Sequence, residues 1–96
     1  MRRADVIAKI QAHRQELARF RVKSLSVFGS VARDEARDDS DVDVLVEFDG
    51  FTGMREHFGL QDYLEELLGA RVDVVTLGGL RKFVRAEAER EAVRVA

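Results

Sequence analysis

The residues of this chain that could do chemistry are a glycine-serine pair and a set of aspartates. Gly29 and Ser30 follow a short apolar run, and Asp41 and Asp43 come after ten intervening residues, at the start of a second apolar run. Because side chains alternate faces along a strand, Asp41 and Asp43 share one face, roughly 6 to 7 Å apart. Free backbone N–H groups after the glycine would favour an anion such as phosphate. The combination predicts a metal-dependent nucleotide site.

The paired carboxylates suit a hard cation. Mg²⁺ keeps several waters and takes one or two protein carboxylates plus phosphate oxygens, which two acids at this spacing can supply. Two-metal sites hold ions about 3.5 to 4 Å apart, so a third carboxylate is needed. Asp73 lies in the middle of another apolar run, Arg71–Val75. If that run pairs beside the first two strands, Asp73 completes the cluster.

These acids have other interpretations. The pair could line the solvent side of an ordinary half-exposed strand, and the glycine-serine pair could be a bare turn at a strand end. Acids are depleted in strands, so the recurrence of one at Asp73, together with the glycine-serine spacing, favours a site. A calcium loop beginning at Asp39 fails, because its sixth position is Val44 and its twelfth is Gly50. The sequence contains no Walker loop.

Composition limits the possible classes of protein. Ninety-six residues with 46% hydrophobic and 35% charged content predict one domain over residues 1–96. The absence of cysteine excludes disulfides and thiolate metal sites. No apolar run approaches the ~18 residues of a membrane span, and the charged amino terminus is unlike a signal peptide, so a cytoplasmic location is expected. A net charge of −2 disfavours nucleic acid as the direct substrate.

The elements that must position the acids follow from hydrophobic periodicity and turn residues. The pattern predicts an α+β fold, with a small mixed β-sheet, helices packed on one face, and the carboxylate face open as a cleft. The expected order is α-β-α-β-α-β-α. The predicted helices cover residues 4–20, 31–36 (about one turn), 60–68 and 80–92, and the predicted strands cover residues 25–28, 42–48 and 71–75.

The glycine-serine pair, the ten-residue spacing, the D-x-D of Asp41 and Asp43 and the later strand aspartate resemble the signature of the minimal nucleotidyltransferases. These proteins are a branch of the DNA polymerase beta-like superfamily. The resemblance extends over most of the chain, although only the signature is specific. It implies that Gly29 and Ser30 hold a triphosphate and that Asp41 and Asp43 bind two Mg²⁺ ions. Asp73 would share a metal and help to activate the acceptor hydroxyl.

The resemblance also implies a further phosphate contact, a substrate and a partner. Arg33 is the further phosphate contact, although many relatives carry glycine at the next position, where this chain has Asp34. ATP is the expected substrate, and a HEPN-domain toxin is the expected partner, whose tyrosine an antitoxin of this kind adenylylates. Two alternatives stay open: a binding module that neutralises its partner by contact alone, and nucleotidyl transfer to a small molecule.

Overall fold

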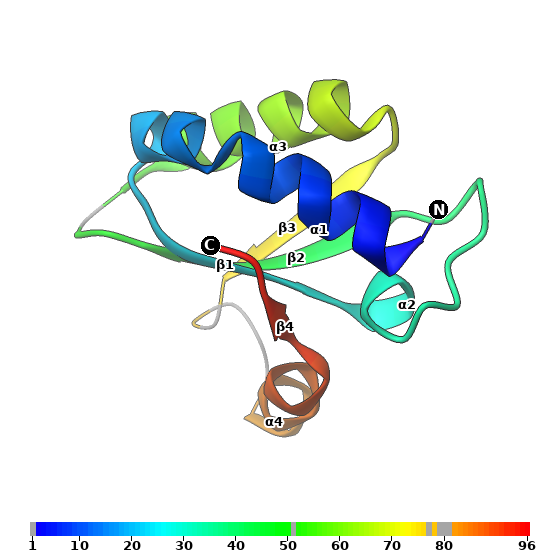
Figure 1. Ribbon diagram of the computed structural model, residues 1–96. Helices are drawn as coiled ribbons and strands as arrows, with labels where there is room; N and C mark the ends of the chain where they lie inside the picture. Colours follow the sequence, from blue (N-terminus) through cyan, green and yellow to red (C-terminus); the bar gives the residue numbers. More distant parts are fainter. Residues whose placement is uncertain (1, 51, 77, 79–81) are drawn as a thin grey trace.

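The computed structural model describes residues 2–50, 52–76, 78 and 82–96. Helices α1 and α3 lie side by side over one face of the sheet, whereas α4 lies on the other side of it (Figure 1). The elements, in chain order, are α1 (Arg3–Ala12), the 3-10 helix η1 (Arg14–Phe20), β1 (Val22–Phe28), α2 (Gly29–Ala32), β2 (Val42–Phe48), α3 (Met54–Leu68), β3 (Val72–Thr76), α4 (Lys82–Glu91) and β4 (Val93–Arg94).

The sheet is mixed, which confirms the predicted α+β fold, but the helices do not all lie on one face, because α4 lies on the side expected to be open. Its strand order is β3-β2-β1-β4. β1 runs antiparallel to β2 and to β4, whereas β2 and β3 are parallel. The parallel pair requires a crossover, and α3 provides it, as is usual for parallel neighbours. β2 therefore lies at the centre of the sheet, between the strand that ends at the glycine-serine pair and the strand that carries Asp73.

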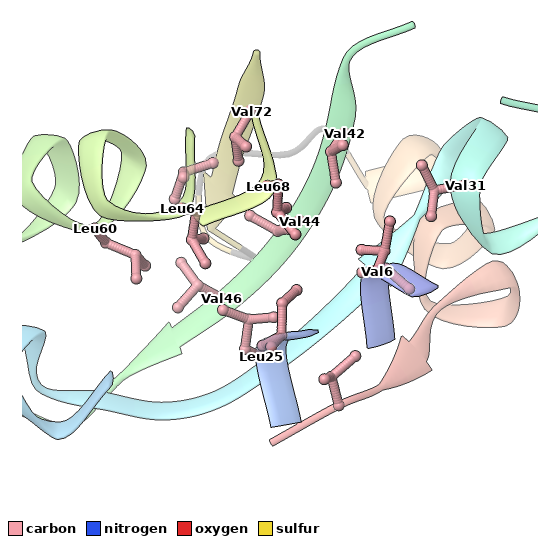
Figure 2. Close-up of a cluster of buried hydrophobic side chains, with 14 of the residues drawn as sticks. Val6, Leu25, Val31, Val42, Val44, Val46, Leu60, Leu64, Leu68 and Val72 are labelled. Carbon is pink, nitrogen blue, oxygen red and sulfur yellow. The ribbon is translucent and has the colours of Figure 1, made fainter. Parts of the chain in front are cut away.

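One face of β2 forms the middle of the hydrophobic core. Val42, Val44 and Val46 are at most 1% exposed and pack against the inner faces of α1 and α3, which contribute side chains such as Val6 and Leu64 (Figure 2). Since the side-chain period of a strand is two, the alternate residues of β2 point to the opposite face. A register slip of one residue would bury the aspartates and expose the valines, so the core fixes the face on which the acids lie.

The amino-terminal helix differs from its prediction. One helix was expected over residues 4–20, but α1 ends at Ala12 and η1 follows. The spacing of the apolar residues that face the core changes at the break. Val6 and Ile10 are buried and lie four residues apart, as in an α-helix, whereas the buried Leu17 and the partly buried Phe20 lie three apart, which is compatible with the three-residue turn of a 3-10 helix.

Helix α3 begins earlier than predicted. The glycines at 53 and 59 suggested a loose segment before a helix at Leu60, yet α3 starts at Met54. Glu56 accepts a hydrogen bond from the backbone N–H of Gly53 at 3.0 Å, which closes the first turn. Gly59 lies inside the helix at a point where a side chain would be crowded, because the ring of Phe20 lies 3.0 Å from where its Cβ would be. The glycine marks a close contact between helices there.

The carboxyl-terminal segment also differs from the prediction. The expected helix ran to residue 92, but α4 ends at Glu91, and β4 then pairs with β1 through Val27↔Val93 and Ser26↔Arg94. A two-residue strand has too little alternation to be recognised in a sequence, and its pairing partner is distant in the chain. Leu80, the first residue of the predicted helix, lies outside the described residues. Within the described ranges, no helix is both long and apolar enough to span a bilayer.

Candidate active site

The glycine-serine turn packs directly against one of the aspartates. β1 ends at Phe28, which pairs with Asp43 of β2, and the chain then turns into α2 at Gly29 with a φ of 70°. A Cβ at Gly29 would collide with the Asp43 carboxylate, whose Cγ lies 3.2 Å from that position. Both the left-handed backbone and the contact therefore require glycine. The loop backbone at this turn lies against the Asp43 carboxylate.

Two of the predicted carboxylates are brought together by strand register. Asp43 of β2 and Asp73 of β3 are direct partners across the parallel pair. Residues in register on neighbouring strands point to the same face, and the strands lie about 4.8 Å apart. This face is the one turned away from α1 and α3. The structure therefore contains the pairing of β2 with β3 on which the predicted meeting of Asp43 and Asp73 depended.

The electrostatics of Asp43 show that the acids influence one another. Asp43 is half-buried, and this burial, followed by the charges of Asp73 and Asp41, raises the pKa of its carboxyl group above the ordinary value. The nearby charge of Arg33 acts in the opposite direction. A carboxylate that is partly removed from water beside two like charges is a favourable place for a cation.

Asp41 lies just before β2 and has a basic partner. Its Oδ1 is 3.2 Å from Nε of Arg71, and the Val42 N–H donates to the Arg71 carbonyl at 2.8 Å. Among the described residues, no three acidic, histidine or cysteine side chains are arranged as they would have to be to hold a metal ion. The Arg71 side chain is 80% exposed, and exposed pairs contribute only ~0 to 1 kcal/mol, so Asp41 can exchange this partner at small cost.

The type of oxygen donor in this region suits a hard cation, although the described side chains are not gathered as metal ligands. Asp43 and Asp73 supply carboxylates from neighbouring strands, and Asp41, just before β2, is near enough for its charge to act on Asp43. Carboxylate oxygens, water and phosphate oxygens are the ligands that Mg²⁺ prefers. The three-carboxylate metal site itself stays a prediction.

Arg33, which follows α2, lies on the rim of the site. Its guanidinium donates to Glu35 through Nε at 3.2 Å and to both carboxylate oxygens of Glu91 through Nη1 at 3.1 and 3.0 Å. These two acids, Glu35 first, raise the pKa of Arg33 above its ordinary value. Ser30, in the first turn of α2, is partly exposed, and its carbonyl accepts from the Glu35 N–H at 2.8 Å.

Asp34 is hydrogen-bonded to the first residue of α1. It adopts a left-handed conformation with a φ of 58°, which glycine adopts more readily than other residues. Its Oδ1 accepts a hydrogen bond from the backbone N–H of Arg3 at 2.9 Å, at the beginning of α1. The negative charge of Asp34 therefore caps a helix.

Sequence reasoning missed the roles of Arg71 and Glu91. Glu91 belongs to α4 and contacts Arg33, from which it is separated by 58 positions in the sequence. No local sequence pattern predicts such a contact. Glu91 also lines a pocket of about 240 Å³ beside the turn. The pocket is lined by Phe28, Gly29, Arg33, Glu87, Ala88 and Glu91.

Comparison with known proteins identifies the family to which this arrangement belongs. A family model described as a nucleotidyltransferase domain matches residues 10–95. The chain is a member of this nucleotidyltransferase family. The minimal branch that its signature resembles is supported by a solved structure described as a candidate minimal nucleotidyltransferase. That structure is 42% identical in sequence, with a TM-score of 0.85, and the match covers 97% of this chain and 95% of the other.

Two sequence relatives of this nucleotidyltransferase have names that state an activity. A protein adenylyltransferase MntA of Thermococcus cleftensis is 44% identical over 92 residues, which cover 95% of this chain and 93% of the relative. A candidate protein adenylyltransferase of Methanocaldococcus jannaschii is 38% identical over 78 residues, which cover 80% of each chain.

A more distant crystal structure shares the nucleotidyltransferase fold. It is described as a toxin-antitoxin with AMP-PNP and has a TM-score of 0.72, with 90% of this chain and 72% of the other covered. At 18% identity, this similarity shows the fold alone.

Proposed function

We propose that this nucleotidyltransferase transfers AMP from ATP to a hydroxyl group of a partner protein and thereby acts as the antitoxin of a toxin-antitoxin pair. The observation that carries the proposal is the register pairing of Asp43 with Asp73 beside the Gly29 turn. The relative named protein adenylyltransferase supports a protein acceptor. The antitoxin role follows from the resemblance of the signature, and a structure described as a toxin-antitoxin shares the fold. A tyrosine of a HEPN-domain toxin is the expected acceptor, and the use of ATP agrees with a cytoplasmic location.

The reaction is an in-line displacement at the α-phosphorus of ATP. The acceptor oxygen forms a bond to phosphorus, the bond to pyrophosphate breaks, and the hydroxyl proton passes to solvent. Catalysis of this kind is mainly positioning and charge neutralisation. Gly29 and Ser30 present backbone N–H groups to the terminal phosphates and so orient the leaving pyrophosphate. Arg33 lies beside them and can contribute positive charge after it leaves its carboxylate partners.

The aspartates would hold Mg²⁺. Asp41, Asp43 and Asp73 would bind it, and when bound it supplies neutralisation of the phosphate charge and a lower pKa for the acceptor hydroxyl. Asp73 lies on the outer of the two strands, because β3 ends the order of the sheet. Its carboxylate is therefore the one that faces an acceptor approaching from that edge.

A labelling experiment tests the proposal. The chain is incubated with Mg²⁺, ATP labelled at the α-phosphate and the protein encoded beside it. Label should appear on that protein with the wild type and should be lost with Asp41→Asn/Asp43→Asn. The matched control is Glu47→Gln, which removes an exposed acid from the other end of the same strand face. Equal labelling by the wild type and the double variant would refute the assignment of the aspartates.

A second measurement separates the roles of the aspartates. Because Asp73 is assigned to the acceptor side, Asp73→Asn should reduce transfer far more than it reduces ATP binding measured by calorimetry. Asp43→Asn should reduce both, since Asp43 lies against the phosphate loop. A parallel loss of binding and transfer in Asp73→Asn would contradict the acceptor-side assignment.

One observation favours the contact-only alternative. The ion pair between Asp41 and Arg71 shows that at least one of the three acids can serve as an ordinary surface partner. A binding module would neutralise the toxin equally well with and without Asp41 and Asp43, and no label would be transferred. The discriminating measurement is therefore toxin neutralisation by the double variant. Label on a low-molecular-weight acceptor instead of a protein would indicate transfer to a small molecule.

A further inference from the structure

The contact between Arg33 and Glu91 joins the phosphate loop to the last helix. Nη1 of Arg33 donates to both oxygens of Glu91, at 3.1 and 3.0 Å, and the two side chains are 45% and 34% exposed. Glu91 is the last residue of α4 and lies at the edge of the pocket that Gly29 also lines. The end of α4 is therefore tied to the residue that follows the glycine-serine turn by an ion pair that water can reach.

The position of Arg33 makes this tie relevant to the nucleotide. Arg33 lines the same pocket as Gly29 and Glu91, and its charge also acts on Asp43. Phosphates bound at the Gly29 turn would lie beside the same guanidinium. Arginine pairs with phosphate and with carboxylate through the same fork of N–H donors, so the two anions would compete for it.

We propose that Glu91 is an internal competitor of the nucleotide phosphates for Arg33, so that Glu91 sets the affinity for ATP and ATP binding loosens the end of α4. This inference rests on the proposed function, because it assumes that a triphosphate binds at the turn. Exchange of one anion for another at Arg33 costs little, since the pair is exposed. Helix α4 would lose its tie to α2, while β4 would keep its backbone pairing with β1.

The neighbouring acids distinguish Glu91 from a general negative surface. Glu87 also lines the pocket, and Glu35 holds the Nε of Arg33, but Glu91 is the acid that links Arg33 to a different helix. Glu89 lies on the same helix and pairs with Arg85 at 3.6 Å. Glu89→Gln therefore removes the same charge from α4 without touching the Arg33 contact, and it serves as the matched control.

The test compares Glu91→Gln with Glu89→Gln by calorimetric titration with Mg²⁺ and ATP. Glu91→Gln should bind ATP about 2- to 5-fold more tightly, the size of effect that an exposed ion pair can exert. Glu89→Gln should leave the affinity unchanged. In an Arg33→Gln background, Glu91→Gln should not change the affinity for ATP, because the guanidinium for which Glu91 and the phosphates compete is then absent.

Hydrogen exchange provides the second readout. Backbone amides at the end of α4, such as that of Ala92, should exchange faster in Glu91→Gln than in the wild type without ATP, and faster in the wild type when ATP is added. Weaker binding by Glu91→Gln, unchanged binding, or equal tightening in the Arg33→Gln background would each overturn the inference. If neither the wild type nor any variant binds ATP, both the proposed function and the inference fail. If the wild type binds ATP and Glu91→Gln binds it with the same affinity, only the inference fails.

Discussion

Replacing Gly29 with alanine should damage both the stability of the protein and its nucleotide site. Gly29 has a φ of 70°, and a Cβ there would collide with the carboxylate of Asp43. A left-handed conformation costs an L-residue roughly 1 to 2 kcal/mol. The collision adds a second cost, because Asp43 must leave its rotamer, which requires about 0.5 to 1.5 kcal/mol.

The two costs can be converted into a change of melting temperature. Their middle values sum to about 2.5 kcal/mol, and in a domain of 60 to 100 residues each kcal/mol lowers Tm by about 4 to 8 °C. Gly29→Ala should therefore lower Tm by roughly 10 to 20 °C. Because the displaced group is Asp43, calorimetry should also show weaker binding of ATP in the presence of Mg²⁺.

Gly69 provides the control for the backbone cost alone. It ends α3 with a φ of 64°, and nothing lies within 4 Å of where its Cβ would be. Gly69→Ala should cost only the roughly 1 to 2 kcal/mol of the left-handed conformation. ATP binding should be unchanged, because Gly69 is at the other end of α3 from the first turn and makes no contact with the aspartates.

A double variant isolates the collision. In an Asp43→Ala background the carboxylate is gone, so adding Gly29→Ala should cost no more than Gly69→Ala does. The measurements are thermal unfolding by circular dichroism for all four variants and ATP titration for the two single glycine variants. Equal Tm losses for Gly29→Ala and Gly69→Ala, with normal ATP binding by Gly29→Ala, would refute the contact between the turn and Asp43.

Three further outcomes follow from other contacts. The pKa of Asp43 is raised in the folded protein, so its charged form opposes folding and the stability of the protein falls as the pH rises through that pKa. Thermal unfolding without metal should therefore show Asp43→Asn to be more stable than the wild type at pH 8, and this difference should disappear below about pH 4. Asp34→Ala loses the hydrogen bond to Arg3 and keeps the left-handed strain, so denaturant unfolding should find it less stable than Asp34→Gly by about 1 kcal/mol. Leu64 is fully buried, so Leu64→Ala should lower the free energy of unfolding by about 2 to 5 kcal/mol in the same assay.

The sequence predicted the central part of the site because local rules govern it. The valines at every second position from Val42 to Val46 determine which face β2 buries, and its predicted bounds of 42–48 match the structure. The glycine-serine turn at the end of a strand was also a local signal. The direct pairing of Asp43 with Asp73 needed one further step, the parallel register of β2 and β3, which sequence could give only as a condition.

The parts that sequence did not predict depend on contacts between distant segments. β4 exists because Val93 and Arg94 meet β1, and two residues carry no periodic signal of their own. The break between α1 and η1 was visible in the spacing of buried residues, but a stretch of helical spacing does not distinguish the two helix types strongly. Glu91, one of the two acids that hold Arg33, comes from α4, and Arg71, the partner of Asp41, lies just before β3, so only the folded chain brings these pairs together.

The site has a rigid half and an adjustable half, and the energies involved show why. Asp43 and Asp73, as carboxylates about 5 Å apart at an effective dielectric constant near 20, repel by no more than about 3 kcal/mol, and by less where water screens Asp73. The same strands bury valines, each contributing about 1.5 to 3 kcal/mol, so two of them offset the repulsion. Register and core therefore hold this pair in place.

Asp41 and Arg33 are held differently. Asp41 lies outside β2 and is restrained by an exposed pair with Arg71, and Arg33 is restrained by exposed pairs with Glu35 and Glu91. Pairs of this kind contribute ~0 to 1 kcal/mol each, well below the burial energy that fixes the strands. A cation and a triphosphate would therefore reorganise Asp41 and Arg33 and leave the β2–β3 pair unchanged. Hydrogen exchange should then change at the end of α4 and before β2 on ATP binding, while the amides of Val44 and Val74 stay protected.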